Sequence, residues 1–302
     1  MGLEDIPLRR FAKRGLSVST IAGQFWCEKR VELSFLYPLP KTEVMSIGKA
    51  RHDELHKEIA ELISVRTTST TDMIGVRLHN MVVGLARVLK RKRTRELPVI
   101  GFFSGLNTPV IGQIDELQVE GKRTRIIDHK TRMSNKMPSL SQIRVAEFQL
   151  MTYYRLLKQI RSEPLDLENV LNFYGLNESS LLTQEFLAQL EPGHRPKERN
   201  LLKLGNIAVT FAKRIPELSE ELEVIYENQE TNRIIGSHRF QFSEEAWKQD
   251  LEFASQYWLG KRPAKPVSEG NRWKCAYCGF KERSICPVWT QSYRGKVELS
   301  IF

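Results

Sequence analysis

The sequence predicts a single α/β domain with a mixed central sheet and helical additions. Three short runs rich in β-branched and apolar residues, at 96–99, 110–117 and 126–130, predict neighbouring strands. Gly121-Lys122 is a turn signal between the second and third runs. Segments with apolar residues at helical spacing flank these strands, and such a mixture is typical of the α/β class.

Helices account for most of the chain before the strands. Ser19 or Thr20 is a candidate N-cap for a helix that runs through Cys27. A second helix covers 45–63 and a third covers 72–92, because their apolar residues recur at helical spacing. The third ends in a run of cations that suits the helix dipole and leads directly into the first strand: Arg87, Lys90, Arg91, Lys92, Arg93 and Arg95.

The chain after the three strands alternates between helix and strand patterns. A helix contains 148–153, and the apolar run 170–174 predicts a further strand that completes the sheet. The polar, basic stretch 191–204 predicts a loop, and 222–242 predicts a hairpin. Ser243 is the expected N-cap of a closing helix.

The length of 302 residues could fill one large domain or two small ones. No repeat or linker divides it, so we expect one domain built from four consecutive segments. These are an N-terminal segment 1–44, a core 45–180, helical and hairpin additions 181–270, and a C-terminal segment 271–302.

The charge balance points to a polyanionic partner. The chain carries 46 Lys and Arg against 36 Asp and Glu, a net charge of +10. Such an excess favours nucleic acid through counterion release, although charge alone is weakly specific. No apolar run is long enough to cross a bilayer, and Glu4 and Asp5 stand where a signal peptide would be apolar. We therefore expect an intracellular protein, cytoplasmic in a prokaryote and nuclear or mitochondrial in a eukaryote.

Two acids and a lysine stand at intervals that predict a metal site. Asp128 and Lys130 point to one face of their strand and His129 to the other, because side chains alternate. Asp115 shares the face of Asp128 if the hairpin register allows it. The paired carboxylates would hold a hard cation such as Mg²⁺ or Mn²⁺. The alternative is that these acids form ordinary ion pairs on the surface.

A downstream glutamine and tyrosine strengthen the metal-site interpretation. Gln149 and Tyr153 are four residues apart, a spacing that places both side chains on one face of a helix. The ordered series of acid, turn, Asp-x-Lys and Gln-x-x-x-Tyr is much more specific than any one of its parts.

The four cysteines predict a second metal site. Cys275, Cys278 and Cys286 lie close together in sequence, and Cys27 lies near the other end of the chain. Two disulfides are disfavoured in a reducing compartment. A site with four thiolates fits zinc or an iron-sulfur cluster, and the spacing does not separate the two.

Together, these motifs resemble the RecB-type branch of the PD-(D/E)xK nucleases. The strings at 25–28, 95–99, 114–117 and 273–275 are most similar to exonuclease V, and the similarity extends over most of the chain. It implies a restriction-endonuclease-like core with a [4Fe-4S] staple. Two features depart from the family pattern. Asp128 stands where glutamate is common, and the last cysteine interval, 279–285, is longer than usual.

The resemblance also assigns roles to individual residues. It implies that His52, four residues after Gly48, faces the metal and that Glu96 lies close to the active centre. The backbone carbonyl of His129 becomes a further metal ligand. By the same resemblance, Lys130 orients the attacking water, and two residues position the substrate or the lysine: Gln149 and Tyr153. Cys27, Cys275, Cys278 and Cys286 become the cluster ligands.

The expected function is that of a magnesium-dependent, single-strand-specific DNA exonuclease that releases short oligonucleotides in DNA repair or replication. We expect a monomer, with a single-stranded-DNA-binding protein as a candidate partner. Three alternatives stay open: a CRISPR-associated nuclease of spacer acquisition, a zinc-stabilised DNA-binding protein without nuclease activity, and a zinc peptidase. The last rests on His52 and His56, but Asp53 stands where the peptidase motif requires glutamate.

Overall fold

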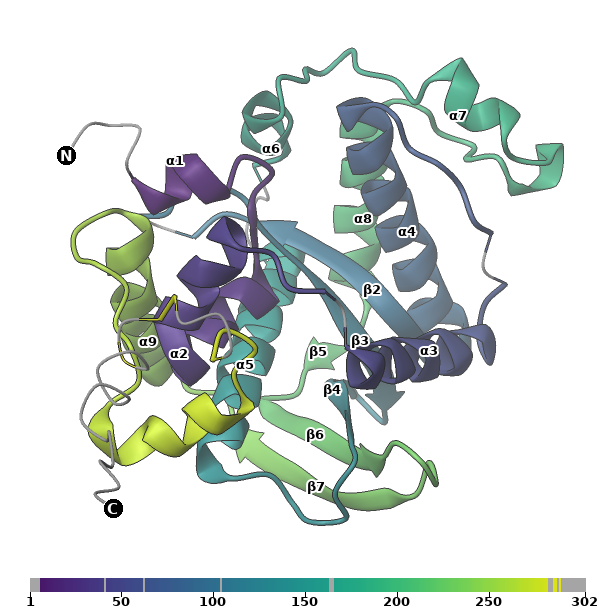
Figure 1. Cartoon of the computed structure of the whole chain (residues 1–302). Helices are drawn as coiled ribbons and strands as arrows, with labels where there is room; N and C mark the ends of the chain where they lie inside the picture. The colour runs from purple at the N-terminus through teal and green to yellow at the C-terminus, as the bar shows by residue number, and fades with distance from the viewer. Residues whose placement is uncertain are drawn as a thin grey trace, which may run out of the picture.

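The computed structural model describes residues 6–40, 42–61, 63–103, 105–162, 166–281, 285, 286 and 288. Most of the C-terminal stretch after 281, which belongs to the expected cluster-binding segment, lies outside the described residues. The elements follow in the order α1 (Pro7–Phe11), β1 (Leu16–Ser17), α2 (Val18–Leu36), α3 (Glu43–Lys57), α4 (Thr70–Arg91), β2 (Arg93–Gly101), β3 (Val110–Glu120), β4 (Arg123–Arg132), α5 (Leu140–Ser162), α6 (Leu167–Phe173), α7 (Gln184–Ala188), the 3₁₀ turn η2 (Pro192–His194), α8 (Leu201–Arg214), β5 (Glu217–Leu218), β6 (Glu221–Asn228), β7 (Ile234–Gln241), α9 (Glu244–Trp258) and η3 (Glu269–Tyr277) (Figure 1).

The expectation of a mixed central sheet with helices around it is confirmed. The described residues form a seven-stranded sheet in which β3 runs antiparallel to β2 and β4, while β4 runs parallel to β5 and β6. β7 pairs with β6 as an antiparallel hairpin (Figure 1). The turn between β3 and β4 falls at Gly121, whose φ of +56° suits glycine.

One edge of β3 is shared by two strands that do not meet. β2 pairs along the other edge from Val110 to Gln118, except at Asp115. On the shared edge, β1 pairs with Val110 and Ile111, and β4 pairs only from Glu116 onward. Among the described residues, no strand pairs with 112–115 on that edge, which leaves an opening in the sheet beside Asp115.

Two groups of helices pack around the sheet. α4 packs against β2 and α8, and α5 packs against α2, α8 and β2 (Figure 1). The close approach of α4 to β2 requires glycine at position 84, because a Cβ there would lie 2.6 Å from Leu97 Cδ1. The interior of α5 is almost fully buried, and this rigid helix carries Gln149 and Tyr153 to the opening.

The prediction of a strand at 170–174 was wrong. Residues 170–173 belong to α6, and Tyr174 is its C-cap. The Asp166 side chain caps the other end by accepting from the Asn169 backbone N–H. Leu167, Val170 and Leu171 are buried at helical spacing. A short apolar run does not distinguish a buried strand from one buried turn of helix, and here the cap decided the outcome.

Several helix boundaries also differ from those expected. Ser17 caps α2, in place of Ser19 or Thr20, because its side chain accepts from the Thr20 backbone N–H. Ser69 caps α4, and α3 ends at Lys57, well before 63. The expected loop 191–204 contains η2 and the start of α8. The β6–β7 hairpin and the Ser243 cap of α9 are confirmed. No described helix combines the length and apolar character needed to span a membrane.

Candidate active site

Asp115 and Asp128 meet at the point where β3 and β4 separate. The last paired residues are Glu116 and Ile127, and the two aspartates occupy the next position on each strand. In place of a ladder hydrogen bond, the backbone N–H of His129 donates to Asp115 Oδ2 at 2.8 Å. Both carboxylates are buried on one face of the sheet, as strand alternation predicts.

Lys130 lies on the same face and contacts Asp128 directly. Its Nζ lies 2.8 Å from Asp128 Oδ2 and donates to Gln149 Oε1 at 3.4 Å. Gln149 Nε2 in turn donates to Asp128 Oδ1 at 3.3 Å and to the Tyr153 hydroxyl at 3.2 Å. Gln149 of α5 thus holds both members of the Asp128–Lys130 pair in place, and Tyr153 of the same helix holds Gln149.

Burial and charge together set the ionisation of this pair. Burial raises the pKa of the Asp128 carboxyl above its usual range, although the Lys130 ammonium opposes the shift. Burial disfavours the charge on Lys130, but the carboxylates of Asp128 and Asp115 outweigh it and raise the pKa of the lysine. Lys130 is therefore a fixed cation at neutral pH, suited to stabilising negative charge and unsuited to accepting a proton.

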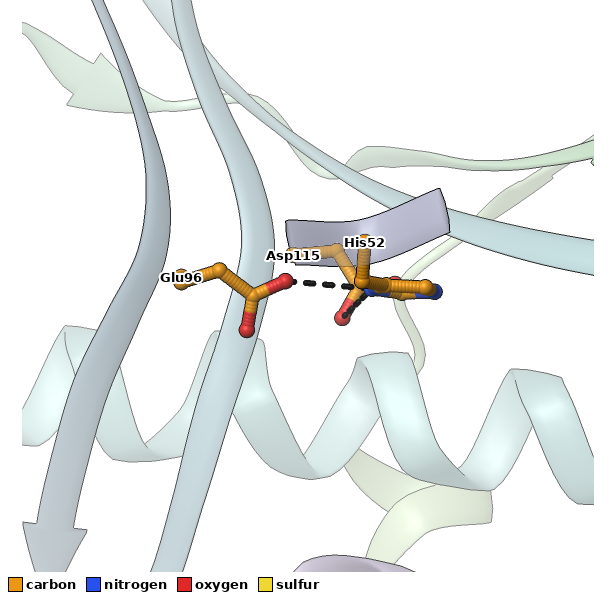
Figure 2. Close-up of side chains that lie close together, drawn as sticks. All are labelled: His52, Glu96 and Asp115. Atoms are coloured by element: carbon orange, nitrogen blue, oxygen red, sulfur yellow. Dashed lines mark hydrogen bonds and ion pairs between the residues drawn. The ribbon is translucent and has the colours of Figure 1, made fainter. Parts of the chain in front are cut away.

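His52 and Glu96 complete the site from two other elements. His52 lies on α3, and its Nδ1 is 3.0 Å from Glu96 Oε1 and 3.9 Å from Asp115 Oδ1. Figure 2 shows the Glu96 and Asp115 side chains pointing toward the imidazole. One ligand atom from each of these three residues lies within 4.8 Å of the others, a geometry that could hold a metal ion. Asp128 is not a member of this group.

The second nitrogen of His52 reaches the carbonyl that the sequence singled out. His52 Nε2 lies 3.1 Å from the backbone oxygen of His129, so this oxygen contacts the ring nitrogen that does not face Glu96 and Asp115. The hydrogen bond that His52 donates to Glu96 raises the pKa of His52 to about 9, against the opposing effect of burial. In the absence of a metal, His52 is thus an imidazolium that neutralises two carboxylates, and a divalent cation would take over that role.

The backbone of Glu96 is strained. Glu96 lies in the middle of β2, and it was expected to open the strand. Its φ is +53°, a value that non-glycine residues rarely adopt, yet the residues on both sides stay in register with β3. Strain of this kind concentrates at functional sites, and here it re-aims one carboxylate toward His52 and Asp115.

The opposite face of the sheet carries an ion network that the sequence analysis missed. Glu116 accepts from Arg93 Nε at 2.6 Å and lies 2.9 Å from Arg95 Nη2 and 2.8 Å from His129 Nε2. On the other side of His129, Nδ1 lies 3.6 Å from Glu227. The network fixes the His129 ring, and hence the backbone whose carbonyl faces His52. The signal was available, because alternation along β3 places Glu116 opposite Asp115.

Replacing Glu116 by glutamine is expected to destabilise the fold in a pH-dependent way. Burial alone would raise the pKa of Glu116, but hydrogen bonds from His129 and Arg93 lower it to about 2. The stabilisation is therefore complete above the ordinary value of 4.5 and is lost as pH falls toward 2. We expect a loss on the order of 3 kcal/mol at pH 7 and less than half of that at pH 3.

Urea unfolding at both pH values measures this effect. Glu217→Gln is the matched control, because Glu217 forms an exposed pair with Arg123, and such pairs contribute about 1 kcal/mol or less. Equal losses in the two variants, or a Glu116→Gln loss that does not shrink in acid, would contradict the buried network.

The four cysteines gather around one small apolar cavity. Cys27, Cys275, Cys278 and Cys286 all line it, and no disulfide joins any two of them. Cys27 interrupts α2 with an extended backbone (φ −170°, ψ 113°), and the Arg30 backbone N–H donates to its sulfur at 3.4 Å. Burial raises the pKa of the Cys27 and Cys275 thiols. A bound metal cation would lower these pKa values again, because it stabilises the thiolate form. Four sulfurs, an apolar wall and an N–H donor fit a metal-thiolate centre.

Comparison with known proteins decides the family. The family model described as exonuclease V, a 5′ deoxyribonuclease, matches residues 6–126, 120–203 and 197–286. These matches cover nearly the whole chain. The chain belongs to the exonuclease V family. It is accordingly an enzyme, a nuclease that acts on DNA as an exonuclease.

One curated exonuclease V supports the same family. The exonuclease V of Danio rerio is 28% identical over 298 residues, which cover 93% of this chain and 72% of the relative. A crystal structure of a candidate exonuclease from Eubacterium rectale matches all of this chain and 96% of that chain, with 11% identity and a TM-score of 0.38. The family match favours exonuclease V over the CRISPR-adaptation branch, and the zinc peptidase loses its basis because His56 lies outside the group of metal-ligand atoms.

Proposed function

We propose that this exonuclease V family member hydrolyses single-stranded DNA from the 5′ end with Mg²⁺ or Mn²⁺, releasing short oligonucleotides, through a PD-(D/E)xK core. The convergence of Asp115, Asp128 and Lys130 on one face of the opening in the sheet carries the proposal. The enzyme would act as a monomer in DNA repair or replication, with a single-stranded-DNA-binding protein as a candidate partner.

The donor set fits a hard divalent cation. Asp115, Glu96 and the His129 carbonyl offer oxygen, His52 offers one nitrogen, and Asp128 lies next to them. Oxygen ligands suit Mg²⁺, and a single imidazole is compatible with Mn²⁺. When bound, the ion supplies charge neutralisation at the phosphate and lowers the pKa of a coordinated water.

Lys130 and its neighbours perform the remaining tasks. The Lys130 ammonium, held by Asp128 and Gln149, is placed to orient the attacking water and to offset negative charge on the phosphate. Tyr153 fixes Gln149 by accepting its amide hydrogen. Each contact holds a side chain before substrate arrives, so little reorganisation is required during the reaction.

The cysteine cavity would hold a [4Fe-4S] cluster that serves as a structural staple. It joins the interrupted α2 to the C-terminal segment that follows α9, and it lies apart from the residues proposed for hydrolysis. The iron would therefore take no part in the chemistry on DNA.

Replacing Asp115 by asparagine is expected to abolish digestion. We expect a loss of about a thousandfold or more, because the variant removes a metal-ligand charge while keeping the side-chain shape. The measurement compares 5′ and 3′ end-labelled single-stranded and duplex DNA with Mg²⁺, Mn²⁺ or chelator. Asp53→Asn, an exposed aspartate on α3, is the matched control and should digest normally. Equal digestion by both variants, or digestion in chelator, would refute the site.

A further inference from the structure

A groove lies beside Glu96. It lies between α4, the end of α3 and the α7–η2 segment, and its volume is about 250 Å³. Glu96 belongs both to this groove and to the group of metal-ligand atoms, so the groove adjoins that group at this residue. Sites for drug-sized ligands start at about 300 Å³, so this groove suits one small planar group.

The groove has the lining of a base-binding site. Val76, Val83 and Phe186 supply apolar wall, while His79, Asn80 and Gln113 place an imidazole and two amides along it. Burial lowers the pKa of His79, so its ring is a neutral surface at pH 7. Imidazole rings stack on unpaired bases, and amides hydrogen-bond base edges.

Arg87 adds a cation to the lining of the groove. Its Nη1 makes one long hydrogen bond, 3.4 Å to Thr94 Oγ1, and no carboxylate of the described residues forms an ion pair with it. Its neighbour Arg95 differs, because it is paired with Glu116. A half-buried guanidinium without a carboxylate partner is suited to a phosphate oxygen.

We propose that this groove binds the nucleoside next to the scissile phosphate, with Arg87 contacting the adjoining backbone phosphate. The inference deepens the proposed function and rests on it. A space of this size admits one base and excludes a base pair, so the base must be unpaired before it enters. The groove would thereby make the enzyme select single strands at the cleavage position itself.

The test fills the groove from an exposed position. Asn80→Trp places a large ring in it from α4, and Asn206→Trp makes the same change on the exposed side of α8, where it lines none of the described pockets. We expect Asn80→Trp to raise the KM for oligo(dT) about tenfold, because the tryptophan ring occupies the space in which one base would stack. Asn206→Trp should match the wild type. Val83→Trp, also exposed on α4, repeats the test if Asn80→Trp does not fold.

Two further substrates separate the subsite from the metal site. An oligomer made only of abasic tetrahydrofuran nucleotides has phosphodiester bonds and no ring that stacks, so Asn80→Trp should hydrolyse it at the wild-type rate. Oligonucleotides with one abasic residue, placed in turn at each position near the 5′ end, should contain a position at which wild type and Asn80→Trp become equal. That position identifies the nucleotide that occupies the groove.

The outcomes are distinguishable. The inference is overturned if Asn80→Trp and Asn206→Trp have the same KM for oligo(dT), if the penalty persists on every oligonucleotide with one abasic residue, or if Asn80→Trp also loses hydrolysis of the fully abasic oligomer. Failure of the proposed function would look different, because the wild-type enzyme itself would then digest neither DNA nor the fully abasic oligomer with Mg²⁺.

Discussion

Replacing Lys130 by methionine is expected to lower kcat on single-stranded DNA about a thousandfold, since removing one preorganised donor from a transition state has effects of that order. Lys130 is the cation nearest to Asp128, and Gln149 holds it in place. Methionine keeps the length and the apolar stem of the side chain and removes the charge. The KM should change much less than kcat, because Lys130 acts on charge that develops during the reaction.

The controls separate loss of the ammonium from loss of the metal. Removing Lys130 also leaves Asp128 without its cation, so metal binding must be measured beside activity. We expect Lys130→Met to bind Mn²⁺ nearly as the wild type does, by titration calorimetry or electron paramagnetic resonance. Lys122→Met, at the exposed β3–β4 turn, should retain full activity. If Lys130→Met digests DNA at the wild-type rate, the lysine has no role in hydrolysis.

The sequence alone predicted which site residues share one face of a strand or of a helix. Asp128 and Lys130 share a face because strand side chains alternate, and Gln149 and Tyr153 share one because they lie four apart on α5. These rules act over a few residues, so they hold before the tertiary structure is known. Whether Asp115 meets Asp128 depended on the β3–β4 register. The two-residue turn at Gly121 and Lys122 fixes a register that brings the two aspartates together.

The remaining features of the site arise from tertiary packing, which local sequence rules do not predict. The opening in the sheet exists because β1 and β4 divide one edge of β3 and leave residues 112–115 between them. The reversed φ of Glu96 has no sequence signal, since glycine would be expected there. The approach of His52 from α3 was implied only by resemblance to a family. The groove beside Glu96 combines residues of α3, α4, β2, β3, α7 and η2, and no sequence motif marks it.

Replacing Cys27 by serine is expected to remove the cluster and to destabilise the whole chain. Cys27 and Cys275 are separated by most of the sequence, and closing a loop of that length costs on the order of 5 kcal/mol in chain entropy. A metal-thiolate centre offsets this cost only while its ligands are present. A loss of that size corresponds to a fall in Tm on the order of 10 °C or more.

Anaerobic purification, iron and sulfide analysis, visible absorbance and thermal unfolding measure the effect together. Wild-type protein should be brown and contain iron, whereas Cys27→Ser should be colourless with a lower Tm. Chemical removal of the cluster from the wild type should lower Tm to the value of the variant, because both then lack the same link. Stoichiometric zinc without iron would reject the cluster, and an unchanged Tm would reject the staple. Since Lys130 and Asp115 lie outside the cysteine cavity, any variant protein that remains folded should retain its kcat, which separates a structural staple from a catalytic one.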